Sequence, residues 1–141
     1  MPTLFSRIIA GELPGTFVWR DDVCVAFLSI NPVRPGHALV VPRAEVDHWI
    51  DLPPDAACHL MTVSGTIGRA QQQAFHPARI GLLIAGMEVP HAHLHLIPIR
   101  GESDLHLSNA ARSVDPDELA GNAAAIRVAL RDQGAHGVAE S

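Results

Sequence analysis

The chain of 141 residues is poor in positive charge. Lysine and arginine together number only 10, against 15 aspartates and glutamates, and the formal net charge is −5. A long nucleic-acid backbone is bound by clustered positive charge, and no basic run is present, so a nucleic-acid polymer is excluded as a partner. A single nucleotide remains compatible with this composition.

Cysteine is equally scarce. Cys24 and Cys58 stand alone, outside any CxxC pair, and two cysteines cannot form the disulfide framework of a small secreted domain. A chain of this length, with 48% hydrophobic residues, can bury a core without such bridges. We therefore expect reduced, packed thiols in a single domain that covers residues 1–141.

Leader-like and membrane-spanning patterns are also missing. The apolar stretch after Arg7 is too short for a signal peptide and soon meets Glu12 and Pro14. The apolar stretch 80–99 contains a glutamate, two prolines and three histidines, which excludes a membrane span. We therefore expect a cytoplasmic protein with no membrane partner. A P-loop and a GxGxxG are absent too, so a phosphate would need another binding device.

Hydrophobic periodicity and turn residues predict an α+β fold with a mostly antiparallel sheet. We predict helices over residues 4–10, 54–74 and 116–132. We predict strands over residues 16–19, 23–28, 37–42, 80–85 and 91–98. The last two strands are joined by too few residues for a parallel crossover, so they should form a hairpin. The tail 134–141 is expected to be frayed.

Three histidines mark the last predicted strand. His91, His93 and His95 alternate with apolar residues, and side chains two apart on a strand point to the same face. Imidazole changes protonation near neutral pH and can act as base, acid, nucleophile or metal ligand. Packing gives no reason for three histidines in register, so we interpret this face as chemical.

The residues alone leave three roles for this row. Neighbouring histidines about 6.6 Å apart could share a zinc ion, but the outer pair at about 13 Å could not, so His37 or Glu88 would have to contribute. A purely structural row at a sheet edge is the second role. Nucleophilic attack on phosphorus is the third, with neighbouring imidazoles neutralising phosphoryl oxygens. Gly86 would let the backbone approach a phosphate closely.

The motif His91-x-His93-x-His95, followed by two apolar residues, resembles the signature of the histidine-triad (HIT) nucleotide hydrolases and transferases. Further segments resemble the family in the expected order and extend the resemblance over a core of residues 3–99: Phe5-x-x-Ile8-Ile9-x-x-Glu12-x-Pro14, Pro35-Gly36-His37-x-Leu39-Val40-x-Pro42 and Ala85-Gly86-x-x-Val89-x-His91. The resemblance implies a HIT-like fold: an antiparallel sheet of about five strands, a main helix, and short N-terminal and C-terminal helices. Residues 100–141 form an extension without a close counterpart.

The resemblance also implies a homodimer with one continuous sheet, acting on a purine nucleotide or nucleotide conjugate at its α-phosphate. The substrate would be a nucleoside phosphoramidate, an adenylate ester or a dinucleoside polyphosphate, and no cofactor is expected. By position, His93 would be the nucleophile that becomes nucleotidylated. His95 and His37 would contact the phosphate oxygens and the leaving group. His91 would orient His93 through its backbone carbonyl.

The same resemblance predicts the substrate-binding residues, with ordinary core packing as the alternative for the apolar ones. They are Phe5, Ile8, Phe27, Ser29, Ile30, Leu39, Gly86, Glu88 and Val89. Phe5, Ile8, Phe27, Ile30 and Leu39 would form the wall of the base pocket.

Several positions depart from the family pattern. Ser29 stands where many members have an aspartate for the ribose hydroxyls, so ribose recognition should be weaker. Ile80 stands where an asparagine often lies near the phosphates, and Met87 replaces a glutamine. The Glu88 carboxylate would repel a phosphate unless it is protonated or turned away. A nucleotide-binding or partner-binding dimer with little turnover is therefore the alternative to an enzyme.

A structural zinc ion is not expected. Thr3 and Ser6 occupy the places of a CxxC pair in zinc-bearing relatives, and Glu45 replaces a further histidine ligand. All four histidines of the family pattern are present (His37, His91, His93 and His95), whereas several polar residues that would contact the phosphate and the ribose are replaced. This combination favours an enzyme with altered substrate preference.

Overall fold

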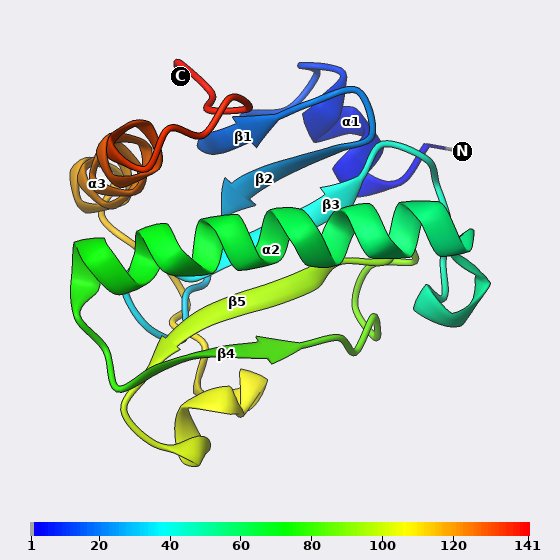
Figure 1. The fold of residues 1–141 in the computed structure, drawn as a ribbon. Coiled ribbons are helices and arrows are strands. Elements are labelled where there is room, and N and C mark those ends of the chain that lie inside the picture. The colour runs from blue at the N-terminus through cyan, green and yellow to red at the C-terminus, as the bar shows by residue number, and fades with distance from the viewer. Residues whose placement is uncertain (1) are drawn as a thin grey trace.

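Five antiparallel strands form one sheet in the order β1-β2-β3-β5-β4 (Figure 1). The structure, a computed structural model, describes residues 2–141. Its strands are β1 (Phe17–Arg20), β2 (Cys24–Leu28), β3 (Ala38–Pro42), β4 (Arg79–Leu83) and β5 (Leu94–Ile99). The predicted α+β fold and the predicted antiparallel hairpin of the last two strands are confirmed.

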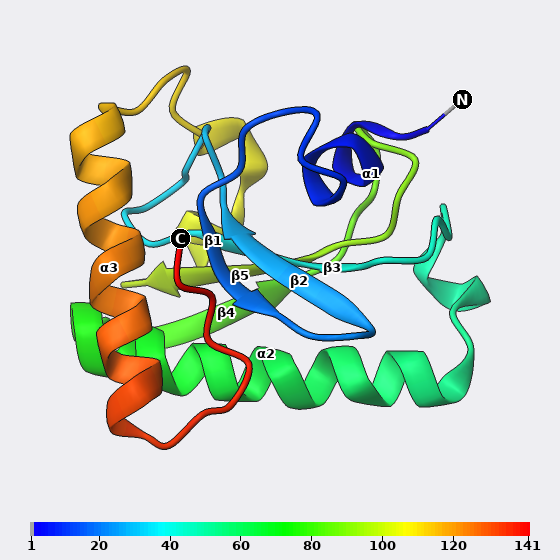
Figure 2. The same cartoon turned by 90° about the horizontal axis from the view of Figure 1, so that it is seen from above.

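The helices lie on both sides of this sheet. They are α1 (Leu4–Ile9), α2 (Pro54–Phe75) and α3 (Pro116–Asp132), and they match the predicted helices closely. Figure 2 shows α2 along one side of the sheet and α1 on the other, while α3 packs against α2 and β1. Within residues 2–141, no helix combines the length and apolar character that a membrane crossing requires.

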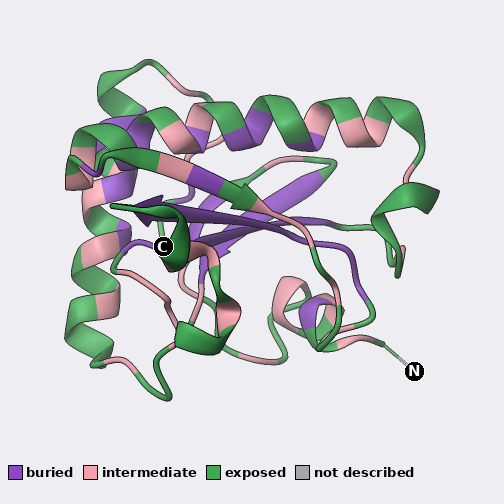
Figure 3. Ribbon diagram, turned by 90° about the horizontal axis from the view of Figure 1, so that it is seen from below, coloured by how far each residue is buried: buried purple, intermediate pink, exposed green. Residues whose placement is uncertain are grey.

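Each face of the sheet buries its own apolar cluster, because successive strand residues point to opposite faces. On the α2 side, Ala26 and Val40 pack with Leu60 and Ile67 of the helix. On the other side, Val25, Phe27, Leu39 and Val41 pack with Phe5 of α1. The strands β2, β3 and β5 are buried along their whole length (Figure 3). The smaller cluster, on the α1 side, lies on the face that carries the histidines.

The last strand is shorter than predicted. It begins at Leu94 instead of His91, and its pairing with β3 ends where Leu94 faces Val40. The N–H of Ala92 donates to Val46 O at 2.7 Å instead of joining the ladder. Proline at position 42, the end of β3, has no N–H to offer the ladder. His91 and His93 therefore lie in an irregular segment just before the strand.

The C-terminal tail is ordered by contact with β1, so the expectation of a frayed tail is wrong. Arg20 N–H donates to Gly137 O at 2.9 Å, and Ala139 N–H donates to Val18 O at 3.0 Å. Ala139 is buried in the cluster on the α1 side. The tail supplies partners to the otherwise unpaired edge of β1, which the local composition of the tail does not reveal.

The expectation of two packed thiols is half right. Both cysteines are free, but only Cys24 is buried, whereas Cys58 is exposed on α2.

Candidate active site

The side chain of His93 is oriented by its neighbour two residues earlier. His93 Nδ1 donates to the backbone oxygen of His91 at 2.7 Å. Because a carbonyl oxygen only accepts, the hydrogen of the neutral ring is on Nδ1. The lone pair of Nε2 is therefore available for attack, and the bond lies where the family resemblance implied it.

A second pair of rings connects β3 to β5. Val33 N–H donates to His37 Nδ1 at 3.1 Å, so the hydrogen of the neutral His37 ring is on Nε2. This Nε2–H donates to His95 Nδ1 at 2.9 Å. The neutral His95 ring then carries its own hydrogen on Nε2 and can donate it. The rings of His93 and His95 lie 4.8 Å apart, so an acceptor nitrogen and a donor nitrogen belong to adjacent rings.

His91 does not share an open face with the other two histidines of the row. It is fully buried, and its ring is bonded at Nδ1 to Thr3 and at Nε2 to Pro42. His93 and His95 keep 5% and 8% of their surface exposed. The predicted row of three therefore reduces to two rings that keep a small exposed area and one ring that is enclosed.

Burial favours the neutral form of His37, His93 and His95. Desolvation, followed by the charge of His93, lowers the pKa of His37 to about 4. Desolvation also lowers the pKa of His95 to about 3, with the charges of His93 and His37 acting in the same direction. The pKa of His93 is lowered by desolvation, although its bond to His91 and the charge of Glu88 oppose the shift. Neutral imidazole is the form that a nucleophile needs.

Most of the predicted pocket wall lies beside these rings. Phe5 packs edge-on against His93, with ring centroids 4.8 Å apart, and against Phe27 at 5.5 Å. Leu39 belongs to the same cluster, and Ile8 and Val89 pack against it. Ile30 differs from these residues, since 68% of its surface is exposed and it does not join the cluster.

The turn before the histidines contains a glycine in a left-handed conformation. Gly86 has φ of +80°, a left-handed geometry that favours glycine. Glu88 is exposed, and its charge acts on His93. The expected place of Ile80 near the phosphates is wrong, because its side chain packs on the α2 side of the sheet. Leu83 is the β4 residue that pairs with His95.

The C-terminal extension reaches the loop that precedes β3. Ala111 N–H donates to Pro32 O at 2.9 Å, and the Asn31 side chain donates to Arg112 O at 2.9 Å. A cavity of about 260 Å³ lies between this loop and the first turns of α3. Its lining includes Ser29 and His37, so it borders the histidine cluster. The Ser29 hydroxyl accepts the N–H of Asn31 at 3.1 Å.

The residues at the zinc-ligand places of some relatives bond to each other instead. Thr3 N–H donates to Glu45 Oε1 at 2.8 Å, and the Thr3 hydroxyl lies 3.2 Å from Ser6 Oγ. Hydroxyl oxygens are poor substitutes for the thiolate and imidazole donors of structural zinc sites. This donor set therefore does not fit a structural zinc ion.

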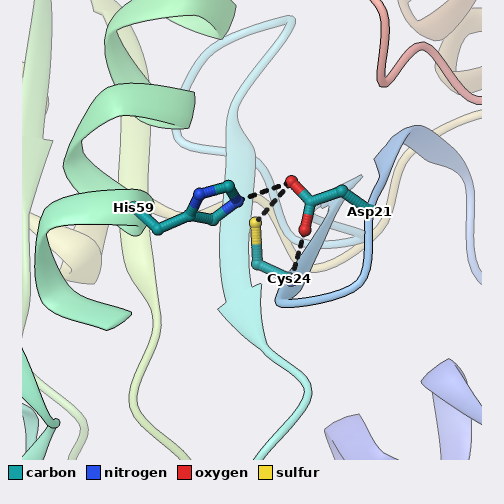
Figure 4. A group of neighbouring side chains, drawn as sticks. All are labelled: Asp21, Cys24 and His59. Atoms are coloured by element: carbon teal, nitrogen blue, oxygen red, sulfur yellow. Dashed lines mark hydrogen bonds and ion pairs between the residues drawn. The ribbon is translucent and has the colours of Figure 1, made fainter. Parts of the chain in front are cut away.

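A second polar cluster, which sequence reasoning missed, connects the β1–β2 hairpin to α2 (Figure 4). The ligand atoms of Asp21, Cys24 and His59 lie within 4.8 Å of one another, which is compatible with a metal site. The Asp21 carboxylate already accepts hydrogen bonds from the ring N–H of Trp19 and from the backbone N–H groups of Val23 and Cys24. It also lies 2.7 Å from His59 Nε2. Burial raises the pKa of the Cys24 thiol to about 12, which disfavours the thiolate that a metal ion would bind. We interpret the cluster as a structural connection, and only the Asp21-x-x-Cys24 spacing could have indicated it.

Comparisons with known proteins agree with this fold. The family model of the HIT domain matches residues 10–102. An uncharacterised HIT-like protein of Methanocaldococcus jannaschii is 34% identical over 121 residues, which are 82% of this chain and 94% of that protein. The adenosine 5′-monophosphoramidase of Saccharomyces cerevisiae is 31% identical over 118 residues, covering 82% of this chain and 75% of the yeast protein.

A solved structure extends the similarity to three dimensions. A Zn-bound histidine triad family protein from Mycobacterium smegmatis superimposes with a TM-score of 0.79 at 26% identity, over 93% of this chain and 94% of that one. The fold and the family model define the histidine-triad class of protein. The chain belongs to the HIT family.

Proposed function

We propose that this protein is a nucleotide hydrolase or nucleotidyl transferase that acts at the α-phosphate of a purine nucleotide conjugate, with an adenylated amine as the main substrate class. The single observation that carries the proposal is the hydrogen bond from His93 Nδ1 to His91 O, which leaves a neutral Nε2 free beside a second imidazole. The similarity to a yeast adenosine 5′-monophosphoramidase supports the substrate class. We place the reaction in the cytoplasm.

The hydrogen positions define the steps. His93 Nε2 attacks the α-phosphorus, an N–P bond forms, and the bond from phosphorus to the leaving nitrogen breaks. The Nε2–H of His95 first hydrogen-bonds to a phosphoryl oxygen and then gives its proton to the departing nitrogen, which leaves as the neutral amine. His37 hydrogen-bonds to His95 Nδ1 and stabilises this orientation. Water then attacks the phosphorus of the nucleotidyl-histidine, returns a proton to the site and releases the nucleotide.

A labelled nucleotide tests the covalent step. The protein is incubated with adenosine phosphoramidate that carries ³²P in the α-phosphate, quenched in alkali and examined for radioactive protein. We expect label on wild type and none on His93→Ala, whose turnover should fall by about 10³-fold or more. His106→Ala, which removes an exposed histidine, is the matched control and should behave as wild type.

The same assay separates the alternatives. Nucleotide that binds equally to wild type and His93→Ala without product would favour a binding protein with little turnover. Loss of activity on chelation would instead indicate a metal-dependent reaction and contradict the role given to His93.

We also propose a homodimer in which two sheets join into one. The C-terminal tail covers the edge of β1, while β4 is the other edge of the sheet and exposes 39% of Leu82. Sedimentation equilibrium should give twice the chain mass of 15.1 kDa. A monomer at micromolar concentration would contradict this part of the proposal.

A further inference from the structure

The carbonyl oxygen that orients His93 lies outside the sheet. Since β5 begins at Leu94, no ladder bond between β3 and β5 fixes the backbone at His91. The local backbone bonds involve N–H groups only: His91 N–H donates to Val89 O at 2.8 Å, and Ala92 N–H donates to Val46 O at 2.7 Å. Because the Ala92 N–H shares a rigid peptide plane with the His91 carbonyl, its bond to Val46 O fixes that plane on one side. The His91 ring is the second anchor, since it holds the same residue through its side chain.

The His91 ring has a defined partner at each nitrogen. Its Nε2 lies 2.7 Å from the backbone oxygen of Pro42, and its Nδ1 lies 2.7 Å from the hydroxyl of Thr3. A carbonyl cannot donate, so the neutral ring carries its hydrogen on Nε2 and accepts at Nδ1. The Thr3 hydroxyl must then be the donor. Because His91 is fully buried, water cannot replace that donor.

Thr3 is itself held in place. Its backbone N–H donates to Glu45 Oε1 at 2.8 Å, and its side-chain oxygen accepts the N–H of Ser6 at 3.0 Å as the N-cap of α1. The hydroxyl hydrogen points to His91 at the shorter distance of 2.7 Å, so the Ser6 hydroxyl, 3.2 Å from Thr3 Oγ1, must be the donor in its own contact with Thr3. The helix that Thr3 caps also carries Phe5, whose ring packs against His93.

We propose that Thr3 is a positioning residue for His93: its hydroxyl fixes the His91 ring, and through it the carbonyl that orients the nucleophile. The chain of bonds runs from Thr3 through His91 to His93 and connects the first helix to the reacting nitrogen. The expected effect on turnover rests on the proposed function. The hydrogen bonds that connect Thr3, His91 and His93 can be measured without substrate.

The first test uses the wild-type protein alone. Long-range ¹H–¹⁵N spectra of histidine rings distinguish the two neutral tautomers and the charged form. We expect His91 as the Nε2–H tautomer with a hydrogen-bonded Nδ1, and His93 as the Nδ1–H tautomer. A His91 ring with hydrogen on Nδ1, or a His93 ring that mixes both tautomers, would overturn the proposal even if every variant failed to fold.

The second test changes the hydroxyl. Thr3→Val removes the donor at nearly constant volume, and Thr3→Ser restores it. Thr62→Val makes the same change on the exposed side of α2, where the hydroxyl bonds only its own helix, and serves as the matched control. In Thr3→Val, we expect the His93 spectrum to become a tautomer mixture and kcat for adenosine phosphoramidate to fall about tenfold or more.

The Michaelis constant separates positioning from general damage. We expect kcat to fall by a larger factor than KM rises in Thr3→Val, because the lost bond to His91 disturbs the nucleophile, whereas the lost N-cap bond to Ser6 affects the pocket only through Phe5. Thr3→Ser should recover most of kcat and the single His93 tautomer. A folded Thr3→Val protein that keeps both would overturn the inference. If wild type shows no turnover, the proposed function fails, and the tautomer spectra still decide whether Thr3 orders the two rings.

Discussion

At the level of single side chains, the chemistry of the site depends on which ring nitrogen carries a hydrogen. Backbone groups decide this for three of the four histidines: Val33 N–H for His37, Pro42 O for His91, and His91 O for His93. The fourth, His95, follows from its bond to His37. Such bonds cannot be foreseen from spacing, although the need for several imidazoles could.

The pH dependence of the reaction should follow the neutral form of His93. Because burial lowers its pKa below the ordinary 6.5, the acid limb of kcat/KM is expected below pH 6.5. The charge of Glu88 raises the same pKa, so Glu88→Gln should move the limb to still lower pH. Glu102→Gln, at an exposed position away from the site, should leave the profile unchanged. A limb at or above pH 6.5 would argue against a desolvated nucleophile.

Ribose recognition can be tested at one position. The Ser29 hydroxyl is engaged by the N–H of Asn31, and a carboxylate can accept the same bond while it also reaches toward ribose hydroxyls. We expect Ser29→Asp to tighten binding of adenosine monophosphate about tenfold, or about 1.4 kcal/mol, by calorimetry. Ser103→Asp adds the same charge elsewhere and should not tighten binding. Weaker binding in Ser29→Asp would mean that the ribose lies elsewhere.

At the level of helices and strands, one glutamine of α2 holds both β5, which carries His95, and the loop residue next to His37, just before β3. Gln71 is fully buried, and its Nε2 donates to Gly36 O at 2.9 Å and to Leu96 O at 3.0 Å. These two carbonyls adjoin His37 and His95 in the chain. The helix on one face of the sheet therefore helps to set the spacing of the rings on the other.

Removal of this donor should be costly. Gln71→Leu leaves two buried carbonyls without it, and we expect the free energy of unfolding in urea to fall by about 2 kcal/mol. Gln73→Leu, two residues further along the same helix, removes only solvent-exposed bonds to Asp132 and Gln133 and should change it by less than about 0.5 kcal/mol. Equal effects of the two substitutions would contradict the role of Gln71.

The elements themselves could be predicted from the sequence because their signals are local. Thr3 as an N-cap, Pro116 at a helix start and the continuous apolar runs of β2 and β3 all act within a few residues. The start of β5 could not be predicted, because it depends on the hydrogen bond that the Ala92 N–H donates to the Val46 carbonyl instead of to β3. Such partners are distant in the chain, and periodicity carries no information about them.

For the protein as a unit, the buried histidines connect stability to pH. The unfolded imidazoles titrate near 6.5, whereas His37 and His95 in the fold have a pKa of about 4 and about 3. Between these values the unfolded chain binds more protons, so its population rises as pH falls. Stability is therefore complete above pH 6.5 and is lost progressively toward pH 4.

Thermal unfolding as a function of pH measures this loss. We expect Tm to decline from pH 6.5 to pH 4 in wild type, and the decline to be smaller in a His37→Asn, His95→Asn double variant. His106→Ala removes an exposed histidine and should keep the wild-type slope. Equal slopes in all three proteins would show that the two rings are not buried in neutral form.

The separation of the two apolar clusters has a practical consequence for redesign. Along β2 and β3, odd positions such as Val25, Phe27 and Leu39 face the candidate pocket, while even positions such as Ala26 and Val40 face the long helix. A library of substitutions confined to the odd positions would change ligand selectivity while the apolar cluster between the sheet and α2 stays intact. A second library, confined to the even positions, would change thermal stability and leave substrate selectivity unchanged. The two properties could therefore be engineered separately.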